Sequence, residues 1–222
     1  MSDQLECVEL LTRNEPVASV IWLHGLGADG YDFVPIVKEL ESLGAPAARY
    51  VFPHAPMIPV TINGGYVMRA WYDIVGTDLV RREDEAGVRR SQQQAEALIA
   101  REVARGMPRS RIVLAGFSQG GAITLQTGLR QAEPLAALVA LSTYLPIAAS
   151  FEPERAAASQ NVPIFMAHGT QDPIIPIERA SSSLETLKRF GYGVEWHEYP
   201  MPHSVCGEEV EDLAAFLKRV LA

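Results

Sequence analysis

The run Gly116-Phe117-Ser118-Gln119-Gly120 matches the pattern G-x-S-x-G, which forms a sharp turn from a strand into a helix. Such a turn holds the serine in a strained backbone conformation with its hydroxyl exposed. The flanking glycines remove Cβ atoms that would collide in so tight a turn. A strand-like run, residues 111–115, precedes the motif, and a run typical of a helix follows it. We therefore predict that Ser118 is a nucleophile; an ordinary glycine-rich turn is the alternative.

A serine hydroxyl is a poor nucleophile at neutral pH, so it needs a base, and a third group must hold that base in the correct tautomer. In sites of this kind the acid follows the serine in the sequence, and the histidine follows the acid. Asp172 comes directly after a predicted strand, residues 163–167, and His203 comes after the last predicted strand. The carboxyl ends of parallel strands meet at one edge of a sheet. We therefore predict Asp172 as the acid, with a simple turn aspartate as the alternative, and His203 as the base.

The other histidines fit the role of the base less well. His24 and His54 precede the serine, and His168 precedes the acid. His197 lies inside an alternating strand, so we expect it on a face of the sheet.

Backbone N–H groups must stabilise the negative charge that develops on the carbonyl oxygen. One is expected from the residue after the nucleophile, Gln119, and the other from the loop after an early strand. The run His24-Gly25-Leu26-Gly27 follows the strand-like residues 20–23. This placement predicts the N–H of Leu26 as the second donor.

Short β-branched and aliphatic runs alternate with longer segments of helical periodicity along the chain. We predict strands at residues 7–11, 18–23, 49–52, 111–115, 137–141, 163–167 and 194–199. We predict helices at residues 32–43, 91–105, 119–130, 177–190 and 208–221. The pattern indicates the α/β class, with a mostly parallel central sheet that has helices on both faces.

Two segments interrupt the alternation. Residues 53–76 contain Pro53, Pro56, Pro59 and the pair Gly64-Gly65, and residues 148–160 are rich in alanine. Long irregular segments in compact domains are often functional loops. We therefore expect residues 53–76 to face the substrate.

The chain has 222 residues, of which 48% are hydrophobic and 21% charged, as in ordinary globular proteins. This length fits one α/β domain, residues 1–222. The net charge of −8 repels phosphate backbones, so nucleic acid is not an expected partner.

The two cysteines, Cys7 and Cys206, do not form a zinc-binding pattern, and we expect free thiols and no metal. The N-terminal residues include acids where a secretory signal would be basic. The longest apolar stretch, residues 135–145, is too short to span a bilayer. We expect a soluble, cytoplasmic protein without a transmembrane segment.

The chain resembles the carboxylesterase/acyl-protein thioesterase family of small α/β-hydrolases. The resemblance covers nearly the whole chain and includes residues 20–29, 52–56, 60–65, 71–73 and 114–121 and the segments around the predicted acid and histidine. It implies an α/β-hydrolase fold without a large cap domain. It also implies Ser118 as nucleophile, Asp172 as acid and His203 as base, with the N–H groups of Leu26 and Gln119 as oxyanion donors.

The implied activity is that of a serine carboxylesterase, which hydrolyses carboxylic esters or acyl thioesters through an acyl-enzyme intermediate without a cofactor. The implied substrate is a small-molecule or lipid ester, or an acylated protein, and a homodimer is implied by the resemblance alone. An acyl-protein thioesterase or a lysophospholipase is the alternative, followed by a ligand-binding relative without catalysis. A peptidase is a further alternative, but we find no inserted cap domain.

The resemblance further implies that residues 53–73 help to form an acyl groove lined by Leu26, Ile62, Met68 and Trp71. A satellite of the core is the alternative for these side chains.

The chain departs from the family next to the histidine. Pro202 stands where relatives often have a more flexible residue, and it is expected to stiffen this loop. Cys206 lies nearby, but it lacks an elbow and follows the histidine, so we expect a buried structural thiol there.

Overall fold

The computed structural model describes residues 5–75 and 82–222. Within these ranges the main sheet has seven strands in the order β1-β3-β2-β8-β9-β10-β11. β1 runs antiparallel to β3, and the other neighbouring strands are parallel. The strands are β1 (Cys7–Leu11), β2 (Ala18–Leu23), β3 (Ala48–Pro53), β8 (Ile112–Phe117), β9 (Ala137–Leu141), β10 (Ile164–Gly169) and β11 (Val194–Tyr199). The predicted α/β class with a mostly parallel sheet is confirmed.

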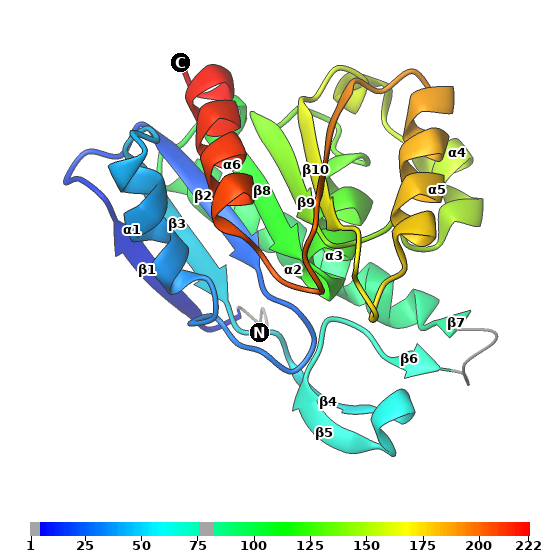
Figure 1. Cartoon of the computed structure of the whole chain (residues 1–222). Coiled ribbons are helices and arrows are strands. Elements are labelled where there is room, and N and C mark those ends of the chain that lie inside the picture. Colours follow the sequence, from blue (N-terminus) through cyan, green and yellow to red (C-terminus); the bar gives the residue numbers. More distant parts are fainter. Residues whose placement is uncertain (1–4, 76–81) are drawn as a thin grey trace.

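Helices cover both faces of this sheet (Figure 1). They are α1 (Val34–Ser42), α2 (Glu85–Ala104), α3 (Gln119–Gly128), α4 (Phe151–Glu154), α5 (Ile177–Arg189) and α6 (Gly207–Val220). Along β2, Val20 and Trp22 belong to the core beneath α1 and α6, whereas Ile21 and Leu23 belong to the core beneath α2 and α3. Burial on both faces explains why the strands are continuous apolar runs. In the part of the chain that the structure describes, none of the helices is both long and apolar enough to cross a membrane.

Helix α2 begins at Glu85, six residues before the predicted start at Ser91. The Asp84 side chain caps the helix, because it accepts a hydrogen bond of 2.9 Å from the N–H of Gly87. Val88 is the only large apolar residue between Glu85 and Ser91, so the apolar periodicity that predicted the helix starts later than the helix itself.

The irregular segment after β3 forms a small hairpin instead of a plain loop. β4 (Met57–Val60) pairs antiparallel with β5 (Tyr66–Arg69), and β6 (Ile74–Val75) pairs with β7 (Arg82–Glu83). Figure 1 shows this hairpin beyond the carboxyl ends of the sheet strands. Gly76, the predicted end of the segment, lies outside the described residues. Within those residues the segment adds only these short strands and one turn of 3-10 helix, so no large cap is found there.

At the turn from β8 into α3, the backbone of the first helical turn lies in direct contact with the backbones of β8 and β2. A Cβ atom on Gly116 would overlap the backbone of Gly120, and one on Gly120 would overlap the carbonyl of Leu23 on β2. A Cβ atom on Gly121 would lie 2.7 Å from the Cγ2 atom of Thr143. A Cβ atom at any of these three glycines would therefore push the start of helix α3 away from the sheet.

Replacing Gly120 by alanine should destabilise the protein, because its methyl group must displace the β2 backbone. We expect the free energy of unfolding to fall by about 3 kcal/mol, at the upper end for overpacking. Gly193→Ala is the matched control, since a Cβ atom there meets nothing within 4 Å. Denaturant unfolding of both variants tests this, and equal midpoints for the two would contradict the packing described here.

Candidate active site

Ser118 occupies the turn between β8 and α3 with φ 55° and ψ −120°. A positive φ is costly for a residue with a side chain, so the surroundings must impose it. The N–H of Ser118 donates to the carbonyl of Leu141 at 2.9 Å. The Ser118 carbonyl accepts a hydrogen bond of 2.7 Å from the Thr143 hydroxyl. The end of β9 thus holds the serine in the strained conformation that the motif predicts.

Asp172 and His203 are joined by a short hydrogen bond, with 2.6 Å between Oδ2 of Asp172 and Nδ1 of His203. The other carboxylate oxygen accepts the N–H groups of Ile174 and Ile175 at 2.8 Å and 2.9 Å. Asp172 is buried, and its carboxylate is therefore fixed in orientation. The bond to Nδ1 leaves Nε2 of His203 on the side of the ring away from the acid.

The loops after β10 and β11 run together and bring the acid and the histidine into contact. The N–H of Thr170 donates to the carbonyl of Tyr199 at 2.8 Å, which extends the strand pairing into the loops. A Cβ atom on Gly169 would overlap the carbonyl oxygens of Met201 and Pro202. Gly169 is therefore required for this close approach. This role was not predicted from the sequence, although a glycine at the end of a strand is a usable signal.

His168 is a fully buried residue that supports the turn around the acid. Its Nε2 atom donates to the carbonyl of Ile175 at 2.8 Å and lies 3.4 Å from Oδ2 of Asp172. Burial lowers the pKa of His168, so the ring is neutral at pH 7. It supports the turn without placing a cation beside Asp172. This supporting role of His168 was not predicted from the sequence, where the residue was weighed only as a base.

The loop after β2 lies directly against the serine. A Cβ atom on Gly25 would lie 3.4 Å from the Cβ atom of Ser118. The N–H of Gly27 donates to the carbonyl of Arg69 at 2.9 Å. Among the described residues, the N–H groups of Leu26 and Gln119 donate to no other group. Both predicted oxyanion donors are thus available beside the serine.

His24 fixes the shape of the loop after β2 through hydrogen bonds to two backbone groups. Its Nδ1 donates to the carbonyl of Gly25 at 2.7 Å, and its Nε2 accepts the N–H of Ala55 at 3.0 Å. The indole N–H of Trp71 donates to the His24 carbonyl at 2.8 Å. Burial lowers the pKa of His24 to about 4. The neutral ring, which donates at one nitrogen and accepts at the other, matches these partners.

The Gln119 side chain ties the start of α3 to the segment after the β4–β5 hairpin. Its Oε1 accepts the N–H of Trp71 at 3.1 Å, and its Nε2 donates to the carbonyl of Tyr72 at 2.8 Å. Both bonds are buried, so they hold this part of the site firmly.

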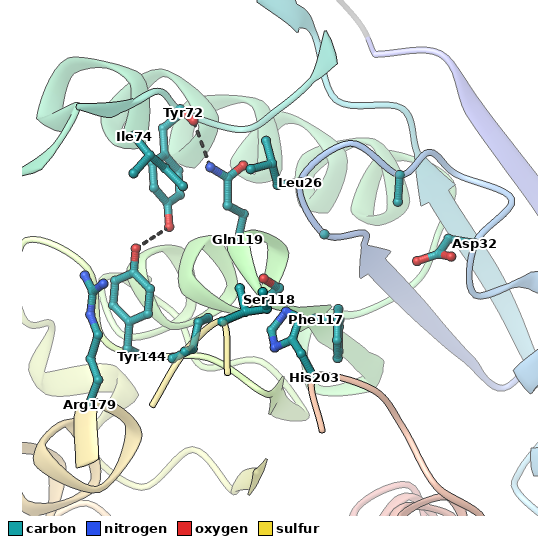
Figure 2. A pocket seen from close by; sticks show the side chains of 14 residues that line it. Leu26, Asp32, Tyr72, Ile74, Phe117, Ser118, Gln119, Tyr144, Arg179 and His203 are labelled. Carbon is teal, nitrogen blue, oxygen red and sulfur yellow. Dashed lines mark hydrogen bonds between the residues drawn. The ribbon is translucent and has the colours of Figure 1, made fainter. Parts of the chain in front are cut away.

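A pocket of about 320 Å³ opens above these groups (Figure 2). Its wall contains Ser118, His203, Leu26 and Gln119, together with Gly25, Ala28, Asp32, Tyr72, Ile74, Phe117, Tyr144, Ile174, Ile175 and Arg179. Figure 2 shows the Ser118 and His203 side chains next to each other. No hydrogen bond joins these two side chains in the described part of the chain. Catalytic hydrogen bonds often tighten only when substrate binds.

Three side chains predicted for the acyl groove do not line this pocket. Ile62 is exposed in the 3-10 turn Thr61–Asn63, and Met68 lies on β5 with its sulfur close to Gly27. Trp71 is buried beneath the loop that carries His24. From the same segment, Tyr72 and Ile74 line the pocket instead.

Cys206 lies at the start of α6 and is half-buried, not fully buried as expected. Burial raises the pKa of its thiol. The thiol does not belong to the wall of the pocket that holds Ser118.

Comparisons with known proteins agree with one another. The sequence matches the phospholipase/carboxylesterase family over residues 7–221. Acyl-protein thioesterase 1 of Mycosarcoma maydis is 41% identical over 224 residues, which cover 93% of this chain and 92% of that protein. Acyl-protein thioesterase 1 of Cryptococcus neoformans is 36% identical over 238 residues and the full length of both chains. The crystal structure of Arabidopsis thaliana SOBER1 has a TM-score of 0.85 and 31% identity, over 92% of this chain and 99% of that one.

The neutral form of His24 should make the protein more stable at neutral than at acidic pH. Its pKa of about 4 in the folded state lies below the ordinary value of 6.5, so the unfolded chain binds the proton more readily. The contribution of His24 is fully present above pH 6.5 and is lost as the pH falls towards 4. Unfolding free energies at pH 7.5 and 5, compared with those of His24→Phe, measure it. An unchanged pH dependence in that variant would refute this role.

Proposed function

The chain belongs to the phospholipase/carboxylesterase family and is a serine hydrolase, and on this premise we propose that Ser118, His203 and Asp172 carry out its acyl transfer. The main support is the hydrogen bond of 2.6 Å between His203 and Asp172, beside a strained serine on the same pocket. The three residues occur in the order that this type of site requires.

In the first half of the reaction, the hydroxyl oxygen of Ser118 attacks the carbonyl carbon of the substrate. Nε2 of His203 takes the hydroxyl proton, while Asp172 holds Nδ1–H and stabilises the imidazolium. The N–H groups of Leu26 and Gln119 bind the oxyanion. One such donor is typically worth about 10²- to 10³-fold in turnover.

In the second half, the tetrahedral intermediate collapses and the alcohol or thiol leaves with the proton from His203. Water then attacks the acyl-enzyme as His203 takes its proton, and the acid and free Ser118 are released. These steps use only groups of this chain and water.

For the substrate, we propose a carboxylic ester or an acyl thioester whose acyl group enters the pocket. The apolar side chains of Leu26, Ile74 and Ile174 on the wall support an acyl chain there. The similarity to proteins named acyl-protein thioesterase 1 supports a lipid ester or an acylated protein as the natural substrate. Rates with esters and thioesters of graded chain length would separate these classes.

We further propose that the chain acts as one domain, residues 1–222, in the cytoplasm and as a homodimer. One sheet that includes both β1 and β11 supports the single domain. Cell fractionation and analytical ultracentrifugation test the other two points.

Replacing Ser118 by alanine should lower turnover on an activated short-chain ester by up to about 10⁶-fold, because the nucleophile is lost. A fluorophosphonate should add to the wild-type protein once, at Ser118, and should not add to the variant. Ser110→Ala is the matched control, since this exposed serine lies at the opposite end of β8. Mass spectrometry and initial rates give both readouts.

Near-normal turnover in Ser118→Ala would refute the assignment of the nucleophile. A wild-type protein that neither turns over esters nor reacts with the fluorophosphonate would instead indicate a ligand-binding relative with a misaligned triad.

A further inference from the structure

The backbone of Ser118 is held on both sides by the end of β9. Its N–H donates to the carbonyl of Leu141 at 2.9 Å, and its carbonyl oxygen accepts the Thr143 hydroxyl at 2.7 Å. The first bond fixes the peptide plane before the α carbon of Ser118, and the second fixes the plane after it. Because the orientations of these two planes define φ and ψ, the bond from Thr143 is the one that acts on the ψ of −120°.

The peptide group that Thr143 holds also contains a proposed oxyanion donor. This group joins Ser118 to Gln119, and it is trans. In a trans peptide the C=O and N–H groups are coplanar and point in opposite directions. The direction of the Ser118 carbonyl therefore fixes the direction of the Gln119 N–H.

The Thr143 side chain is itself held in place. It is buried, so water does not compete for its hydroxyl group. Its Cγ2 atom lies against Gly121, where a Cβ atom would come within 2.7 Å of it. The N–H of Ala122 also donates to the Ser118 carbonyl, at 3.0 Å, but a helix end held only by its own hydrogen bonds frays. Thr143 therefore ties the start of α3 to the sheet.

The turn that carries Thr143 contains a second strained residue. Ser142, directly before it, has a φ of 46°, and its N–H donates to the carbonyl of Ala167 on β10 at 2.8 Å. A positive φ turns the chain sharply as it leaves β9. Strain of this kind persists only where the surroundings impose it, and it occurs mainly at functional sites. Here it immediately precedes the residue whose hydroxyl reaches Ser118.

We propose that Thr143 is a positioning residue for the oxyanion site: through the Ser118 carbonyl, its hydroxyl fixes the direction of the Gln119 N–H. This inference rests on the proposed function, in which that N–H binds the oxyanion. Thr143 does not line the pocket and does not touch the reacting atoms. A donor that is already fixed needs no reorganisation as the oxyanion forms, so the bond from Thr143 acts on the chemical step and not on substrate binding.

The test removes the hydroxyl and keeps the shape of the side chain. In Thr143→Val, kcat for an activated short-chain ester should fall about 10-fold, the upper end for one hydrogen bond, while KM stays the same. Complete loss of an oxyanion donor costs more, about 10²- to 10³-fold, but the bond from Ala122 still holds the carbonyl in this variant.

A trifluoromethyl ketone measures the oxyanion site directly. The Ser118 oxygen adds to the ketone carbon, His203 takes the serine proton, and the ketone oxygen becomes an oxyanion. The inhibition constant of this compound should rise in Thr143→Val by the factor by which kcat/KM falls. The midpoint of the pH–rate profile should stay the same, because His203 and Asp172 are untouched.

Three further variants control the comparison. Thr143→Ser keeps the hydroxyl and should retain most of the kcat. Thr143→Ala lacks the hydroxyl and cannot crowd the turn, so it should show the loss of Thr143→Val and decides the test if that variant does not fold. Thr124→Val is the matched control, since this threonine is buried on α3 and its hydroxyl has no hydrogen-bond partner among the described residues. Its kcat should equal that of the wild type.

The outcomes separate this inference from the proposed function. An unchanged kcat in the variants without the hydroxyl overturns the inference. A lower kcat with an unchanged inhibition constant, a shifted pH–rate midpoint, or an equal loss in Thr143→Ser also overturns it, because the effect would then lie outside the oxyanion site. In all these cases the wild-type protein still hydrolyses the ester. A wild-type protein that neither hydrolyses it nor reacts with the fluorophosphonate contradicts the proposed function, and the inference fails with it.

Discussion

The site depends on the direct backbone contact between helix α3 and strands β2 and β8. Gly116 and Gly120 permit this contact because neither has a Cβ atom to hold the segments apart. It forces Ser118 to a positive φ and leaves the N–H of Gln119 at the first position of the helix. Leu23 pairs with Gly116 in the sheet, so the loop after β2 begins beside the serine. One packing constraint thus places both the proposed nucleophile and the proposed oxyanion donors.

The remaining groups are held mainly by backbone hydrogen bonds. His24 bonds to two backbone groups of its neighbours, and Asp172 accepts two N–H groups from its own turn. Burial lowers the pKa of His168, so this ring adds no cation beside the carboxylate of Asp172 at neutral pH. The backbone groups that hold His24 and Asp172 are fixed dipoles, and they do not have to reorganise as charge develops during a reaction.

Much of this arrangement could be predicted because it follows from local pattern. Buried parallel strands are continuous apolar runs, and groups that follow such strands must meet at one edge of the sheet. Ser118, Asp172 and His203 were predicted in this way, and the structure places them close together. A side chain such as His168 could not be assigned, because its partners come from the fold of the turn around it and not from periodicity.

The pocket wall was harder to predict for a related reason. The irregular segment after β3 has no hydrophobic periodicity that would indicate which side chains face inward. The sequence therefore could not show which of Trp71 and Tyr72 lines the pocket. The structure turns Trp71 into the core, where its indole N–H bonds to His24, and leaves Tyr72 on the pocket. The place of Arg179 in the pocket wall could not be predicted either, because a charged residue in the first turn of an amphipathic helix is normally solvated.

The two functions of Gln119 limit how this protein can change. Its backbone N–H is a proposed oxyanion donor, while its side chain holds the backbone of Trp71 and Tyr72. A mutation that moves this wall will therefore also disturb the start of α3, and new selectivity gained there will tend to cost rate. Arg179 also lines the pocket, but it lies on α5, which has no part in the turn that carries Ser118. Divergence among relatives, and laboratory evolution of selectivity, should therefore proceed more readily through α5 than through the segment that Gln119 holds.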